Sequence, residues 1–125
     1  MENITKNNTR EENAKMTEDI SPFRALDFIR DNSEKYAIAK ANVIYMTEYR
    51  KTIKAILMNE STAKTQTEKE SYAYADKRYI AHLEAMRLAV EEAEKLRWLM
   101  IGAEAKIEVW RSLESTARAE GKATT

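Results

Sequence analysis

The chain has 125 residues and a mass of 14.5 kDa, with 21 basic and 21 acidic side chains. It contains no cysteine, which excludes disulfides, thiolate zinc sites and cysteine nucleophiles, and its one histidine, His82, cannot by itself form a histidine metal cage. Two glycines and one proline are too few for a turn-rich β or α/β fold. The composition therefore predicts a single all-α domain of long helices.

The first 20 residues are rich in Asn, Thr and charged side chains and contain few large apolar groups, so they predict a disordered arm. Ser21 and Pro22 have the residue types of an N-cap and a first helical position, and they predict a short N-terminal helix. The polar run at 31–33 is expected to end or bend that helix. At the other end, residues 121–125 are expected to form a disordered tail.

The next helix is predicted over residues 34–59. Its apolar face is expected to contain Ile38, Ala41 or Asn42, Tyr45, Tyr49, Thr52 or Ile53, and Ile56. Residues 61–69 contain four Ser or Thr and no apolar side chain larger than alanine, so the chain is expected to reverse direction there.

A second long helix is predicted over residues 67–118, interrupted by nothing but Gly102. Its apolar seam keeps heptad spacing from Tyr72 to Ala93 and then drifts to Leu96, Ala103 and Trp110, which favours helix-bundle packing over an extended coiled coil. Such a helix measures about 78 Å, whereas a compact chain of this size is roughly 36 Å across.

These lengths predict an antiparallel helical hairpin spanning residues 21–120, whose uncovered apolar stripe pairs with other copies in a helical oligomer. Trp98 lies off the main stripe and predicts a second contact between subunits. The expected oligomer interface consists of Leu83, Met86, Val90, Trp98, Ile107 and Trp110.

Charge is unevenly distributed although the net charge is zero. Residues 50–87 contain eight basic and five acidic side chains, whereas residues 1–34 contain five basic and eight acidic ones. Tyrosines are interleaved with the basic residues, and single-stranded nucleic acid binds to such mixtures because cations neutralise phosphates and rings stack on bases. The alternative is that these tyrosines are core residues and the cations a solvated face. The candidate nucleic-acid contacts are Arg50, Lys51, Lys54, Lys64, Lys77, Arg78 and Tyr79.

Neither catalysis nor a cofactor is expected, because no nucleophile and base pair or phosphate-binding Gly loop can be assembled. The carboxylates at 91, 92, 94, 104 and 108 lack the Glu-x-x-His pairs of a di-iron bundle, so we expect no metal. His82 is expected at a helix flank or an interface. With no apolar run of membrane-spanning length and a polar N-terminus, the chain is expected to be cytoplasmic and to have no membrane partner.

One family has a similar order of residues. The chain has Tyr36, Ala39, Asn42 and Tyr45, then a basic turn with Ile53-Lys54 and Leu57-Met58, then Arg78-Tyr79 before a long acidic and apolar helix. This order resembles the UvsY family of bacteriophage recombination mediators over about residues 36–118.

The resemblance implies a small phage-encoded ring, with six or seven copies, that binds single-stranded DNA, contacts the single-strand-binding protein and helps load a recombinase. It would assign DNA contacts to Arg50, Lys51 and Lys54 and to 77–79. This chain departs from the family because residues 61–69 split its basic, tyrosine-rich element. The alternative function is a helical protein-interaction module, such as a phage scaffold protein or an inhibitor of a host protein.

Overall fold

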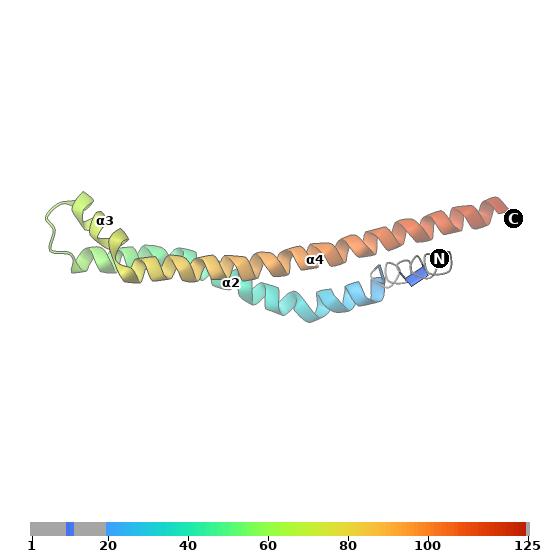
Figure 1. Cartoon of the computed structure of the whole chain (residues 1–125), viewed down its shortest axis with the longest axis horizontal. Helices are drawn as coiled ribbons and strands as arrows, with labels where there is room; N and C mark the ends of the chain where they lie inside the picture. Colours follow the sequence, from blue (N-terminus) through green and yellow to red (C-terminus); the bar gives the residue numbers. More distant parts are fainter. Residues whose placement is uncertain (1–9, 12–19, 125) are drawn as a thin grey trace, which may run out of the picture. The chain divides into compact units, whose positions relative to one another are not determined.

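The computed structural model describes residues 10–11 and 20–124. Over these residues the elements are the helices α2 (Pro22–Glu60), α3 (Gln66–Ala75) and α4 (Lys77–Thr124), with no strand (Figure 1). The all-α prediction is confirmed. The arm predicted over residues 1–20 lies outside the described residues, apart from 10–11 and 20.

Helix α2 begins at the predicted place, since Pro22 is its first residue and the Ser21 carbonyl accepts a hydrogen bond of 3.2 Å from the Ala25 amide. Of the two predicted outcomes at 31–33, an end of the helix is wrong, because α2 continues to Glu60. The Asn32 side chain donates to the Phe28 carbonyl at 2.8 Å, and the Ser33 hydroxyl donates to the Ile29 carbonyl. These side chains bond back to the preceding turn of the helix and so do not end it.

The predicted helix over 67–118 is divided in two at Asp76. Thr65 caps α3 by accepting from the Glu68 amide at 3.2 Å, and α3 ends after ten residues. Asp76 has an extended backbone, with ψ of 138°, and its carboxylate accepts from the Arg78 amide at 2.8 Å, which caps α4. Beyond it, α4 passes through Gly102 and over the expected tail as far as Thr124.

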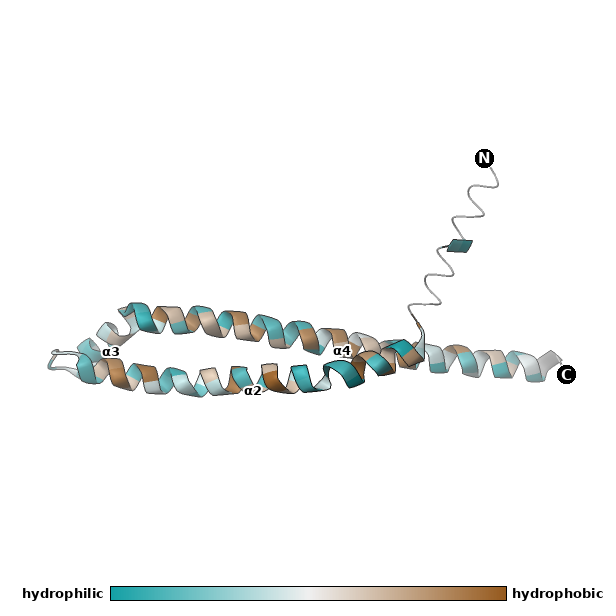
Figure 2. Ribbon diagram, turned by 90° about the horizontal axis from the view of Figure 1, so that it is seen from below, coloured by the Kyte–Doolittle hydropathy of each residue, from teal (hydrophilic) through white to brown (hydrophobic). Residues whose placement is uncertain are grey.

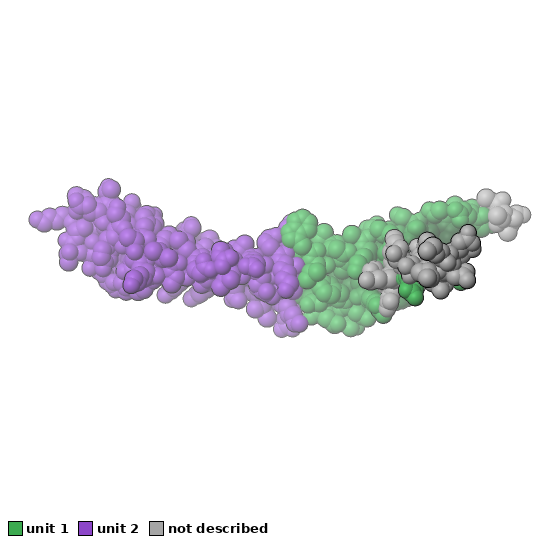
Figure 3. Space-filling view, viewed as in Figure 1, with its two compact units in different colours: residues 1–33, 98–125 green, residues 34–97 purple. Residues whose placement is uncertain are grey.

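The chain divides into two compact units (Figure 3). Unit 1 contains residues 1–33 and 98–125, and unit 2 contains residues 34–97. Unit 2 therefore contains the second part of α2, all of α3 and the beginning of α4, whereas the described helices of unit 1 are the first part of α2 and the remainder of α4.

The core of unit 2 lies where its three helices meet. Leu57 from α2, Ala73 from α3 and Tyr79 from α4 form a buried cluster with exposed fractions of 1%, 0% and 8%. Ile53 and Met58 pack against it. Farther from the turn, α2 and α4 approach each other through small side chains, and Ala39 and Ala93 are buried.

The buried face of α2 differs from the predicted one. The predicted face is exposed at Ile38, Tyr45, Tyr49 and Ile56. The less exposed residues instead repeat at steps of three and four, which is the heptad pattern of a helix packed along one partner. They are Ala25, Ile29, Asn32, Tyr36, Ala39, Val43, Met46, Arg50, Ile53 and Leu57.

Helix α4 follows the same spacing. The predicted seam is confirmed at Leu96 and Ala103 and wrong at Leu83, Val90 and Trp110, so no drift is needed. The less exposed residues of α4 keep a heptad period from Tyr79 onward, through Met86 and Ile107, whereas Leu83, Val90 and Trp110 are exposed. The complete series is Tyr79, His82, Met86, Ala89, Ala93, Leu96, Met100, Ala103 and Ile107. A period of 3.5 residues favours coiled-coil packing over the bundle packing that the sequence predicted.

Among the described residues of unit 1, the buried apolar ones are both alanines, Ala25 and Ala103. Phe28 and Trp98 line a pocket of about 490 Å³ beside them, together with Gly102. Apolar and polar residues alternate along both long helices in Figure 2, and large apolar side chains such as Phe23 and Leu113 are exposed. No described helix is long and apolar enough to cross a membrane.

Candidate nucleic-acid interface

Four of the predicted nucleic-acid contacts lie together in unit 2. Arg50, Lys51 and Lys54 are within two turns of α2, and with Tyr74 of α3 and Tyr79 of α4 they line a pocket of about 300 Å³. We call this pocket the cationic pocket. No acidic side chain lines it. It therefore presents three positive charges and two aromatic rings at one place.

Lys54 is held at the wall of the cationic pocket by α3. Its ammonium lies 4.9 Å from the ring centre of Tyr74 and 3.6 Å from a carboxylate oxygen of Glu70. The Tyr74 side chain, and after it the charge of Glu70, raises the pKa of Lys54 against the opposing effect of desolvation. Lys54 is therefore cationic at neutral pH and has a fixed position.

The other two cations of the pocket are less strongly paired. Lys51 lies 3.1 Å from Glu48, but this ion pair joins exposed side chains on one helix and is weak in water. Arg50 is half-buried in the heptad series of α2, and no hydrogen bond or ion pair joins it to another described residue. A half-buried guanidinium without a carboxylate is favourably placed to bind a phosphate.

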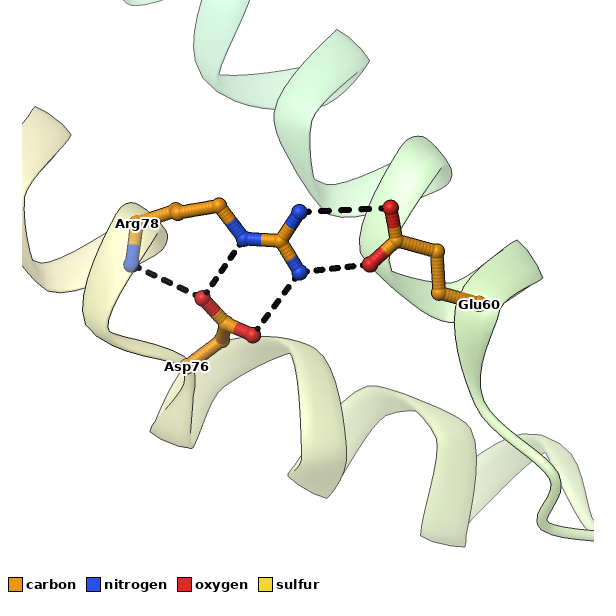
Figure 4. A network of polar contacts seen from close by, with 3 residues as sticks. All are labelled: Glu60, Asp76 and Arg78. Carbon is orange, nitrogen blue, oxygen red and sulfur yellow. Dashed lines mark hydrogen bonds and ion pairs between the residues drawn. The ribbon is translucent and has the colours of Figure 1, made fainter.

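Arg78 forms a separate network of hydrogen bonds and ion pairs with Asp76 and Glu60 (Figure 4). Its guanidinium donates to Asp76 at 3.1 Å through two nitrogens and to Glu60 at 3.2 Å, with a further short bond to Glu60. Arg78 lowers the pKa of both carboxyl groups, chiefly through these hydrogen bonds, and they in turn raise the pKa of Arg78. The network joins the end of α2 to the junction of α3 and α4, which is a structural role.

Tyr79 also has a structural role, because it is buried beside Leu57 and touches Tyr74 edge to face, with ring centres 5.2 Å apart. Lys64 and Lys77 are exposed, in the 61–65 connection and at the first position of α4, and neither lines the cationic pocket. Of the seven predicted contacts, the structure thus brings together Arg50, Lys51, Lys54 and Tyr79.

The sequence did not predict a row of stacked aromatic rings formed by Tyr45, Tyr49 and His82, which we call the tyrosine ladder. Tyr45 and Tyr49 stack with ring centres 5.8 Å apart and an angle of 8° between planes, and His82 of α4 meets Tyr49 edge to face at 5.7 Å. His82 Nε2 donates to the Met46 carbonyl at 2.7 Å; a carbonyl only accepts, so Nε2 is assigned the proton. The spacing of four between the tyrosines could have revealed the stack, had it not been assigned to the core.

Among the residues predicted for the oligomer interface, Met86 and Ile107 are half-buried in the heptad series of α4. Leu83, Val90, Trp98 and Trp110 are exposed. No cluster of three metal-ligating side chains is present in the described part of the chain.

Comparisons with protein-family models, with curated proteins and with solved structures gave no match. The resemblance to recombination mediators stays a prediction.

Proposed function

We propose that this protein is a non-enzymatic nucleic-acid accessory protein that binds single-stranded DNA through the cationic pocket. The observation that carries the proposal is the convergence of Arg50, Lys51 and Lys54 on two tyrosine rings, in a pocket with no acidic lining. Cations that neutralise phosphates, next to aromatic side chains, are the combination on which sequence-independent binding to single strands rests.

In this proposal the chain acts as a homo-oligomer of long helical hairpins. Supporting it, the described residues include one fully buried large side chain, Leu57, while many large apolar groups on α2 and α4 are exposed. Copies packed along these faces would bury them, and a particle with several weak pockets would gain avidity that one pocket lacks. Leu83, Val90, Trp98 and Trp110 are the proposed contacts between subunits.

Within the proposal, the cellular role is that of a phage recombination mediator. The oligomer would hold single-stranded DNA while a recombinase or annealing protein is loaded in the presence of single-strand-binding protein. The support for this finer role is the order of residues shared with the UvsY family, from Tyr36 through Arg78-Tyr79. Lys64 and Lys77 would add outlying charge that attracts the strand, whereas Arg78 and Tyr79 would hold the pocket in shape.

The test is a salt titration of binding to a labelled single-stranded oligonucleotide. For wild type, the logarithm of the affinity should fall linearly with the logarithm of salt concentration, by about 0.7 per phosphate contacted. The double variant Arg50→Ala with Lys54→Ala should bind about tenfold more weakly near 0.1 M salt and reduce the slope by about 1.4.

The matched control is Lys40→Ala with Lys95→Ala, which removes the same charge from exposed positions of unit 2 outside the pocket. It should leave affinity within about twofold of wild type, because its side chains contact no strand in the pocket. Equal losses in both double variants would show that net charge and not the pocket governs binding, and would contradict the proposal.

A second candidate function is a helical protein-interaction module without nucleic-acid binding, such as a scaffold protein or an inhibitor. The exposed apolar side chains favour it equally, because a partner protein would bury them as well as a second copy would. Sedimentation of the protein with and without a labelled oligonucleotide separates the two. The accessory-protein proposal expects an oligomer that binds oligonucleotide, whereas the module expects no oligonucleotide binding at low salt.

A further inference from the structure

The tyrosine ladder of unit 2 lies outside the cationic pocket, and the predicted stacking residue Tyr79 is buried. Tyr45 is 66% exposed and Tyr49 is 39% exposed. Both lie on the face of α2 that was predicted to be core, and Tyr49 meets His82 of α4 there. An exposed pair of nearly parallel rings on this face needs an explanation.

Tyr49, the ring of the tyrosine ladder next to His82, is positioned by a contact with α4. His82 is fixed by its hydrogen bond of 2.7 Å to the Met46 carbonyl, and its edge contacts the Tyr49 ring. Tyr49 in turn stacks on Tyr45 in an offset arrangement, with ring centres 5.8 Å apart and planes 8° apart. These contacts favour the stacked rotamers of the two tyrosines before any ligand arrives, which reduces the ordering entropy lost when a ligand binds.

Tyr45 is the outer end of this ladder, and its exposed ring can accept one more planar group in continuation of the stack. The cationic pocket begins at Arg50, which directly follows Tyr49 and lies about 7.5 Å from Tyr45 along the helix axis and about 140° around it. A strand whose phosphates reach Arg50 and Lys51 therefore brings a base to the Tyr45 ring where its next nucleotides continue around α2.

We propose that the Tyr45 ring, backed by Tyr49 and His82, is a stacking site for a base of single-stranded nucleic acid. This inference rests on the proposed function, because it assigns the bases of the same strand whose phosphates occupy the cationic pocket. In this proposal the cationic pocket contributes the salt-dependent part of the binding free energy. The tyrosine ladder contributes the part that depends on the presence of bases.

The test compares two probes at one salt concentration with the full chain: oligothymidylate of about 20 nucleotides and an abasic oligomer of equal length and charge. Wild type should bind oligothymidylate about 5- to 30-fold more tightly than the abasic oligomer, as expected for one or two stacked bases. Tyr45→Leu should lose most of that difference and leave abasic binding and the salt slope unchanged, whereas Tyr45→Phe should keep it.

The matched control is Tyr72→Leu, since Tyr72 is an exposed tyrosine of α3 for which no ring contact is recorded. It should bind both probes as wild type does. A measurement on the unmodified protein is independent of how the variants fold: oligonucleotide carrying 5-iodouracil should crosslink on irradiation to the peptide that contains Tyr45.

Several outcomes would overturn the stacking site and leave the proposed function standing: equal binding of both probes by wild type, an unaltered preference in Tyr45→Leu, or crosslinks confined to other peptides. A change in sedimentation of Tyr45→Leu without oligonucleotide would show that the ring belongs to a contact between protein chains, which also overturns it. Failure of wild type to bind either probe at low salt would overturn both proposals together.

Discussion

In unit 2 a third helix, α3, packs on α2 and α4, whereas the described part of unit 1 consists of segments of α2 and α4 alone. The buried residues differ accordingly. Unit 2 buries Leu57 and Tyr79 as well as alanines, while unit 1 buries Ala25 and Ala103. A pair of helices encloses only the narrow line along which they touch, so small side chains are buried there and the flanking large ones remain exposed.

The comparison shows where the stability of one chain is concentrated. Burial of a large side chain contributes about 1.5–3 kcal/mol, and in the described residues this contribution is confined to the junction of the three helices. The cationic pocket is built on that junction, since Tyr74 and Tyr79 belong to its walls. The described part of unit 1, in contrast, presents exposed large apolar side chains such as Phe23 and Leu113.

The largest expected effect is at Leu57. Leu57→Ala should lower the free energy of unfolding by about 2–4 kcal/mol, because the side chain is fully buried between helices and leaves a cavity. Denaturant unfolding followed by circular dichroism measures the change. The control Leu26→Ala makes the same substitution at an exposed leucine of α2 in unit 1 and should cost less than about 0.5 kcal/mol. Equal losses would contradict the difference between the units.

The sequence predicted the helical class and the start of α2 because these depend on local chemistry: few glycines and prolines, and Ser21 before Pro22. It left an end and a bend open at 31–33, and no end occurs there, because Asn32 and Ser33 have turn-forming side chains that can also bond back within a helix. It missed the break at Asp76 because the apolar spacing continues across it, although an aspartate before Lys77 is also a capping signal.

The buried face of α2 could not be chosen from periodicity alone. Two apolar series run along this helix, one through Tyr36, Ala39 and Val43 and one through Ile38, Tyr45 and Tyr49. The larger side chains favoured the second series, but the structure buries the first because small residues let α2 and α4 approach closely. The cluster of Arg50, Lys51 and Lys54 was predictable from its spacing, whereas the commitment of Arg78 to Glu60 depends on contacts distant in sequence.

A smaller effect of opposite sign is expected in unit 1. Gly102 lies inside α4, and a Cβ added there would meet no atom within 4 Å. Gly102→Ala should therefore raise the free energy of unfolding by about 0.5–1 kcal/mol, because alanine loses less backbone entropy in a helix. Thermal unfolding measures the gain, and Gly121→Ala, also in open space near the end of α4, should give a smaller one. Destabilisation by Gly102→Ala would indicate that another chain packs closely on this turn.

The smallest expected effect concerns the network at the junction of unit 2. Arg78 holds the pKa of Glu60 below its ordinary value of 4.5 and that of Asp76 below 3.8. A carboxyl group with a lowered pKa in the folded state stabilises the fold fully above its ordinary pKa, and this contribution disappears as the pH falls through the lower folded value.

Unfolding midpoints of wild type and Glu60→Gln should therefore differ slightly, in favour of wild type, between pH 5 and 7. The two midpoints should converge as the pH is lowered through the folded-state pKa of Glu60, since wild-type Glu60 then becomes neutral like glutamine. A difference that persists or grows in acid would show that Glu60 acts by packing and not by its charge on Arg78.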